Sequence, residues 1–164
     1  MKKELIISYE DDASKIALIE DGRLFELHEI QQNTDFVVGD IFVGKIKKLA
    51  PNLNAAFVNI GYEKDAFLHY QDLGPQYLTY RKFLQDTVSK RQQTSSLKNF
   101  QIQPEIDKHG TVDKVMAPQD EVLLQITKEP ISTKGPRIST QISLTGRFLV
   151  LIPFDNKVYI KKKV

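Results

Sequence analysis

The chain has 164 residues, of which 41% are hydrophobic and 27% are charged. This balance excludes a globally disordered chain and suits one ordinary domain or two small ones. The absence of cysteine excludes disulfides, cysteine-ligated zinc and a thiol nucleophile within these residues. No apolar run approaches the roughly 18 residues of a membrane span, and no signal core follows the first residues, which favours the cytoplasm.

Charge is spread unevenly along the chain. Positions 1–35 hold four basic and nine acidic residues, whereas positions 117–164 hold eight basic and four acidic ones. A basic region indicates a face that binds phosphates, although solvated surface lysines explain the same pattern. The three histidines are widely spaced and no carboxylates converge, so the sequence predicts neither a catalytic constellation nor a metal site.

Three β-prone runs open the chain, at residues 5–8, 13–20 and 24–28. Asp21-Gly22 predicts a hairpin turn between the last two runs, and Asp11-Asp12 is a turn candidate between the first two. We therefore expect an antiparallel meander of three strands.

A second group of predicted strands covers residues 40–49, 54–60, 64–69, 121–128 and 137–144. Short strands separated by glycine or proline turns predict a small barrel or sandwich. Residues 71–116 interrupt this group, with a helix expected within 73–86 and a polar stretch at 89–96. We expect residues 88–96 to be the internal segment most sensitive to proteases.

The end of the chain returns to strand character. Residues 148–152 form an apolar run, FLVLI, which predicts a fully buried strand. Asp155-Asn156 predicts a turn, and residues 157–162 are expected to pair back.

The stretch NAAFVNIGYEKDAFLH at 54–69 carries the first candidate site. Strand alternation separates an apolar face (Ala56, Val58, Ile60, Ala66 and Leu68) from a mixed face (Ala55, Phe57, Asn59, Asp65, Phe67 and His69). An aromatic pair beside lysines such as Lys45 and Lys47 is typical of single-stranded nucleic-acid binding, because every base has a face that can stack. The alternative is that a loop or a neighbouring domain covers both phenylalanines.

The stretch TKEPISTKGPRIST at 127–140 carries the second candidate site. It places Lys128, Lys134 and Arg137 in a loop stiffened by proline, and Gly135 allows a close backbone approach. This pattern predicts phosphate binding, although it lacks the spacing of a P-loop and also fits an ordinary connecting loop.

Two runs resemble the amino-terminal part of the ribonuclease E/G family of bacterial endoribonucleases. They are GKIKKLAPNLNAAFVNIGYEKDAFLH at 44–69 and EVLLQITKEPISTKGPRISTQISLTGRFLVLIP at 121–153, and the resemblance covers nearly the whole chain except about 71–116. It implies a mainly β, α+β fold in which an OB-fold RNA-binding barrel at 37–141, with an insert at about 71–116, interrupts a ribonuclease H-like subdomain. The pieces of that subdomain would be residues 1–36 and a truncated 142–164.

The resemblance also assigns roles to residues. It implies that Phe57, Phe67 and Lys134 hold single-stranded RNA, and we add Lys45, Lys47, His69, Lys128 and Arg137 as candidate contacts. The chain departs from the family at four positions. Family members often have aspartate at the position of Asn59, histidine at that of Gln141 and proline at that of Thr145. Some members have an aromatic residue at the position of Ile60.

In this family the 5′-monophosphate sensor, the magnesium-binding aspartates and the zinc-linked dimer contacts would lie beyond residue 164. We therefore expect these residues to bind RNA without a cofactor and without cleaving it. The resemblance implies that the full-length parent is a magnesium- and zinc-containing homo-oligomeric endoribonuclease of RNA processing and decay. The alternative is a stand-alone OB-fold RNA-binding or ribosome-associated module without nuclease activity.

Overall fold

The computed structural model describes residues 1–10, 13–31, 36–92, 96–132 and 134–160. The chain divides into two compact units, Met1–Asp35 and Phe36–Val164. The predicted turn at Asp11-Asp12 lies outside the described residues. No helix in the described ranges has the length and apolar character needed to cross a membrane.

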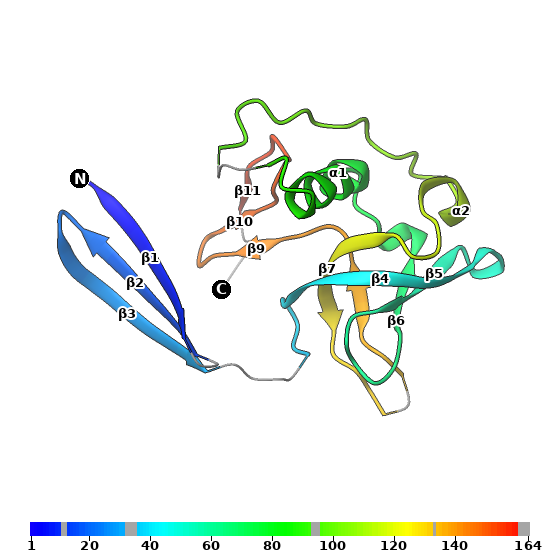
Figure 1. The fold of residues 1–164 in the computed structure, drawn as a ribbon, viewed down its shortest axis with the longest axis horizontal. Helices are drawn as coiled ribbons and strands as arrows, with labels where there is room; N and C mark the ends of the chain where they lie inside the picture. The colour runs from blue at the N-terminus through cyan, green and yellow to red at the C-terminus, as the bar shows by residue number, and fades with distance from the viewer. Residues whose placement is uncertain (11–12, 32–35, 93–95, 133, 161–164) are drawn as a thin grey trace. The chain divides into compact units, whose positions relative to one another are not determined.

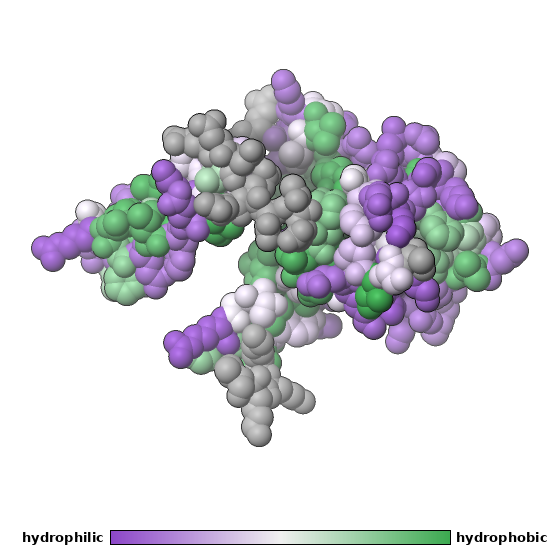
Figure 2. Space-filling model, turned by 90° about the horizontal axis from the view of Figure 1, so that it is seen from below, coloured by the Kyte–Doolittle hydropathy of each residue, from purple (hydrophilic) through white to green (hydrophobic). Residues whose placement is uncertain are grey.

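The first unit is a three-stranded antiparallel sheet in the order β1-β2-β3, as predicted (Figure 1). Its strands are β1 (Lys3–Glu10), β2 (Ala13–Glu20) and β3 (Arg23–Gln31). Asp21 and Gly22 join β2 to β3 with φ of 46° and 79°, the positive values that a tight hairpin turn requires. Apolar side chains are exposed on this sheet, among them Leu5, Ile7, Phe25 and Leu27. Figure 2 shows green residues on it, flanked by purple ones.

The second unit contains a closed barrel of five strands in the order β4-β5-β6-β8-β7 (Figure 1). The strands are β4 (Ile41–Ala50), β5 (Ala55–Asn59), β6 (Ala66–His69), β7 (Glu121–Lys128) and β8 (Arg137–Ser139). Neighbours are antiparallel except β6 and β8, and β4 closes the barrel against β7. This closed five-stranded barrel is consistent with the expected OB-like fold.

The barrel core is built from the predicted apolar face of the 54–69 hairpin. Ala56, Val58, Ala66 and Leu68 are fully buried. Gly44 of β4 has no room for a side chain, because a Cβ atom there would lie 2.6 Å from Leu124 Cδ1 and 2.7 Å from Val58 Cγ1. The alternation of the sequence therefore predicted the correct inward face. Ala55 is the exception, because it was placed on the mixed face and is fully buried.

The segment 71–116 takes part in the barrel core. It forms helices α1 (Tyr77–Val88) and α2 (Val112–Val115), and α1 packs against β7. It also supplies buried core residues, namely Leu73, Tyr77, Val112 and Met116. The helix expected within 73–86 is thus confirmed. Residues 93–95 lie outside the described residues, so the protease sensitivity of 88–96 stays a prediction.

The predicted strand at 137–144 was too long. β8 ends at Ser139, whose hydroxyl donates to the Asp72 carbonyl (2.8 Å), and the Thr140 N–H donates to the same carbonyl (3.2 Å). These bonds turn the chain toward the 3-10 turn Tyr70–Asp72. The next strand, β9 (Leu144–Thr145), joins β10 (Leu149–Leu151) and β11 (Tyr159–Ile160) in a small antiparallel sheet.

The prediction of a fully buried strand at 148–152 was wrong. Phe148 is 63% exposed and Leu151 61% exposed. The strands of this sheet are only two or three residues long, and the described residues leave the side chains of Phe148, Leu149 and Leu151 open to solvent. An apolar run shows that a segment favours burial but does not supply the layer that buries it.

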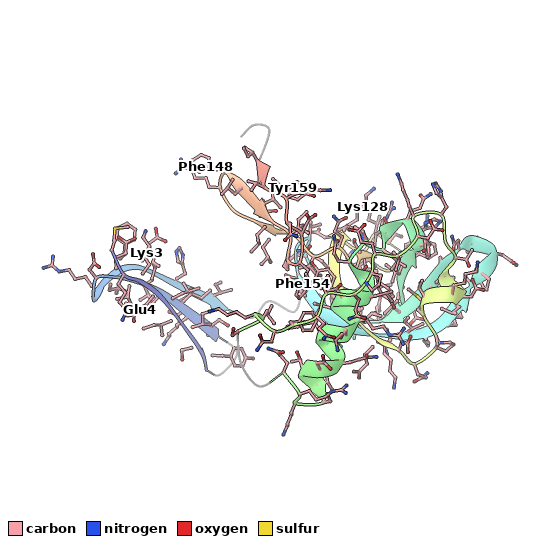
Figure 3. All side chains as sticks on the ribbon, turned by 90° about the horizontal axis from the view of Figure 1, so that it is seen from above. Lys3, Glu4, Lys128, Phe148, Phe154 and Tyr159 are labelled. Atoms are coloured by element: carbon pink, nitrogen blue, oxygen red, sulfur yellow. The ribbon has the colours of Figure 1, made fainter. Side chains whose placement is uncertain are left out.

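A cluster of four aromatic rings attaches this C-terminal segment to α1. Phe154 packs edge-on against Tyr80 of α1 and also contacts Phe83 and Phe100, with ring centroids 5.3–5.8 Å apart. The Tyr80 hydroxyl donates to the Pro153 carbonyl (2.9 Å). Figure 3 shows Phe154 beside α1, whereas Phe148 points away at the outer end of the β9–β11 sheet.

Candidate nucleic-acid interface

A groove of ≈ 770 Å³ opens on the outer face of β5 and β6. Five predicted site residues line it: Phe57, Phe67, His69, Lys134 and Arg137. Asp65, Gly135 and Pro136 of the two candidate stretches also line the groove, together with three residues that the sequence did not single out: Lys48, Lys64 and Gln71. We call this surface the aromatic groove. Its lining holds four cationic side chains and one carboxylate, so it favours an anionic ligand.

Two phenylalanines stand side by side in the aromatic groove. Phe57 and Phe67 are cross-strand partners of β5 and β6, with ring centroids 5.7 Å apart and ring planes at 71°. Both are half-buried. Their neighbours along the strands, Ala56, Val58, Ala66 and Leu68, point into the barrel core. The two rings therefore lie on the outer face of the strands, where part of each ring is open to the groove.

A β-bulge in β4 decides which lysine reaches this pair. Ile46 is opposite Val58, but the next paired residue, Lys48, is opposite Phe57, so Lys47 is the extra residue. The Lys48 Nζ atom lies over the Phe57 ring, 4.9 Å from its centroid. Simple alternation places Lys45 and Lys47 on one face and misses Lys48, because a bulge leaves no signal in the alternation pattern.

Lys47 binds a carboxylate at the edge of the groove. Its Nζ atom donates to both oxygens of Asp65, at 3.0 and 3.1 Å. Asp65 supplies the carboxylate in the lining of the aromatic groove. Lys47 is therefore placed to neutralise a charge that would repel phosphates.

The loop before β8 is clamped against the end of β6. The Phe67 N–H donates to the Pro136 carbonyl (3.3 Å), and Lys64 Nζ donates to the Ser132 carbonyl (3.0 Å). A Cβ atom at Gly135 would clash with the Asp65 carbonyl. The close approach that Gly135 allows is thus made to the protein's own backbone, and it fixes the loop that carries Lys134.

The cations of this loop differ in their availability. Arg137 forms a bidentate ion pair with Asp72 at 2.8–3.1 Å, and these hydrogen bonds raise the pKa of its guanidinium. Lys134 is exposed, and within the described ranges it forms no ion pair. Lys134 is therefore the loop cation whose charge is open to a ligand, whereas Arg137 mainly fixes β8 to the 3-10 turn.

His69 has a defined hydrogen-bonding partner. Its Nδ1 atom accepts a hydrogen bond from the Gln71 backbone N–H (3.1 Å). In the neutral ring, the proton is then on Nε2. His69 thus offers a donor to a ligand in the aromatic groove.

Three predicted site residues do not line the groove: Lys47, whose Nζ atom pairs with Asp65, and also Lys45 and Lys128. Lys45 is exposed on β4, opposite Asn59 on one side and Glu121 on the other. Lys128, labelled in Figure 3, is exposed at the end of β7. It does not line the groove, although its register partner Arg137 does.

No family model matches the chain. Among curated proteins, it is 30% identical to ribonuclease G of Haemophilus influenzae over 161 residues, which cover 98% of the chain and 29% of that protein. It is 28% identical to ribonuclease G of Escherichia coli K12 over 164 residues, which cover 100% of the chain and 30% of that protein. It is 34% identical to ribonuclease E of a Synechocystis species over 128 residues, 77% of the chain and 15% of that protein.

The chain is a ribonuclease E/G family region. The resemblance stated from its motifs is thereby confirmed. The chain spans about 30% of the length of the ribonuclease G relatives it matches.

Two family departures have a structural account in this ribonuclease E/G family region. Ile60, where an aromatic residue was expected in some members, is buried in the barrel core and so does not reach the aromatic groove. Asn59 accepts a hydrogen bond from the Gly61 N–H (2.9 Å) and thus stabilises the turn after β5. Among the described residues, no three His, Asp or Glu side chains gather as a group that could hold a metal ion.

Proposed function

We propose that this ribonuclease E/G family region binds single-stranded RNA in the aromatic groove. The observation that carries the proposal is the pair Phe57–Phe67, half exposed in a groove lined by four cationic side chains. Bases would stack on the two rings, and the exposed Lys48 and Lys134 would neutralise phosphates. Stacking on aromatic side chains contributes about 1–3 kcal/mol per base.

The arrangement selects for unpaired strands. In a duplex the faces of the bases are already stacked, so they cannot reach Phe57 and Phe67 without unstacking. Two polar groups beside the rings, the His69 Nε2–H and the Gln71 amide, are suited to a ribose 2′-hydroxyl, which both donates and accepts hydrogen bonds.

We further propose that the region holds RNA for cleavage by parts of the protein outside these 164 residues. The ribonuclease names of its relatives support this role. The magnesium and zinc ions and the homo-oligomeric assembly expected for the family are assigned to those other parts. Residues 1–36 and 142–164 would be pieces of one ribonuclease H-like subdomain, and the exposed apolar side chains of both sheets support this.

RNA titration in a salt series tests the binding proposal. We expect the chain to bind a labelled single-stranded RNA more tightly than single-stranded DNA of the same sequence, and duplex RNA least. Affinity should fall as salt rises, because phosphate contacts release counterions. Equal affinity for duplex and single-stranded RNA would contradict the stacking geometry.

The gene sequence after Val164 separates the nuclease from the stand-alone module. Two aspartates in a metal-binding setting, followed by a two-cysteine zinc motif, would support the endoribonuclease. An open reading frame that ends close to Val164 would support the RNA-binding or ribosome-associated module instead.

A further inference from the structure

A second groove, of ≈ 620 Å³, adjoins the aromatic groove. The two share Gln71, which lines both. One wall of the second groove comes from the segment 105–109, within the part of the chain for which the motifs showed no family resemblance, so we call it the insert groove. Its half-buried apolar surface includes Pro75 and Ile106, and its exposed charged and polar side chains include Glu105, Lys108 and His109.

The wall formed by residues 105–109 is fixed to the barrel. The Tyr70 hydroxyl donates to the Asp107 carbonyl (2.6 Å), and the Ile106 N–H donates to the Pro75 carbonyl (3.1 Å). Asn54 adds two bonds, donating to the Gly110 carbonyl (3.1 Å) and accepting from the Val112 N–H (2.8 Å). The insert groove is thus a built feature of the fold.

The boundary between the two grooves is also fixed. The 3-10 turn Tyr70–Asp72 carries Gln71, and its Asp72 carbonyl accepts from both Ser139 and Thr140. The Arg137–Asp72 ion pair holds the same turn from the side of the aromatic groove. A strand that leaves Phe57 and Phe67 past Gln71 therefore meets a preformed second surface.

We infer that the insert groove is a second RNA subsite, which continues the RNA path from the aromatic groove across Gln71. This inference rests on the proposed function. A base would lie against the apolar surface at Pro75 and Ile106, and Lys108 would neutralise the following phosphate. Glu105 lies in the same groove and would oppose phosphate binding, so removal of its charge should have the opposite effect to removal of the Lys108 charge.

RNA length distinguishes the two grooves. Binding sites on OB-folds span about 4–16 nucleotides, so an RNA of about 4 nucleotides would occupy the aromatic groove alone and one of about 12 would reach the insert groove. We expect Lys108→Gln to weaken binding of the long RNA by about three- to tenfold at low salt. Its affinity for the short RNA should not change. Glu105→Gln should strengthen binding of the long RNA only.

Lys98→Gln is the matched control, because Lys98 is an exposed lysine of the same segment that lines neither groove. Two long RNAs, each with a photo-crosslinking nucleotide at a different end, should be compared. One of the two should crosslink to residues 105–109. Long-RNA affinity that is unchanged in both Lys108→Gln and Glu105→Gln, while Phe57→Ala weakens both RNAs, would overturn the second subsite alone. Failure of the unaltered chain to bind either RNA would overturn the proposed function and the second subsite together.

Discussion

Adjacent lysines of β4 have different partners because of one bulge. Lys48 lies over the Phe57 ring, where we expect its charge to neutralise the phosphate of a stacked nucleotide. Lys47 instead pairs with Asp65 and reduces the negative charge of the groove lining. Truncation of Lys47 and truncation of Lys48 are therefore expected to weaken RNA binding for different reasons.

We expect Lys47→Ala to weaken RNA binding by exposing the Asp65 carboxylate. The effect should be modest, about 0.2–1 kcal/mol, since the pair is solvent-accessible. Asp65→Asn in the same background should restore binding, because it removes the unpaired charge. RNA titrations of the single and double variants measure this. A loss that persists in the double variant would mean that Lys47 contacts RNA directly.

Lys134→Ala should change the salt dependence of binding. Lys134 is the exposed cation of the clamped loop, so its loss should lower the slope of affinity against salt by about one counterion. Lys128→Ala is the control, because Lys128 lies in the same stretch of sequence but outside the groove. Equal slopes for the unaltered chain and Lys134→Ala would contradict a phosphate contact at Lys134.

At the scale of elements, the contact between α1 and the C-terminal segment depends on Phe154. Phe154 contacts three other rings, whereas Phe148, six residues earlier, is 63% exposed. We expect Phe154→Ala to destabilise the second unit by about 1–3 kcal/mol, less than a fully buried phenylalanine, because its ring is only half-buried.

Thermal unfolding measures this difference. Phe148→Ala should change stability by no more than about 0.5 kcal/mol, as exposed positions usually do. RNA affinity should be unchanged in both variants, because neither residue lines the aromatic groove. Equal destabilisation by the two substitutions would show that the aromatic cluster does not hold the segment.

Local patterns predicted the barrel strands and the inward face, because alternation and turn residues are read from neighbouring positions. The alternation with a period of two placed Phe57 and Phe67 on the outer face of the strands and Ala56 and Leu68 on the inner face. Long-range features were not predictable in this way. The parallel pairing of β6 with β8 and the clash that excludes a side chain at Gly135 each depend on a partner far along the chain, and the bulge at Lys47 leaves no mark in the alternation of β4.

At the scale of the whole molecule, we propose that RNA binding and RNA cleavage belong to different parts of the protein. The described residues contain a groove lined by four cationic side chains, and among them no group of acidic or histidine side chains gathers that could hold a metal. We expect the purified 164-residue chain to leave single-stranded RNA intact in the presence of magnesium. Gel analysis of end-labelled RNA measures this. Cleavage that disappears on mutation of one of the chain's own carboxylates would contradict the assignment.

RNA binding as proposed depends above all on the stacking of bases on Phe57 and Phe67. The most direct test is one RNA titration across a salt series on Phe57→Leu and Phe67→Leu, variants that keep apolar bulk against the barrel but lose the aromatic face. We predict a loss of about 1–3 kcal/mol in binding for each, with an unchanged salt slope and a thermal unfolding profile that shows the barrel is folded. Folded variants that bind RNA as tightly as the unaltered chain would contradict the account.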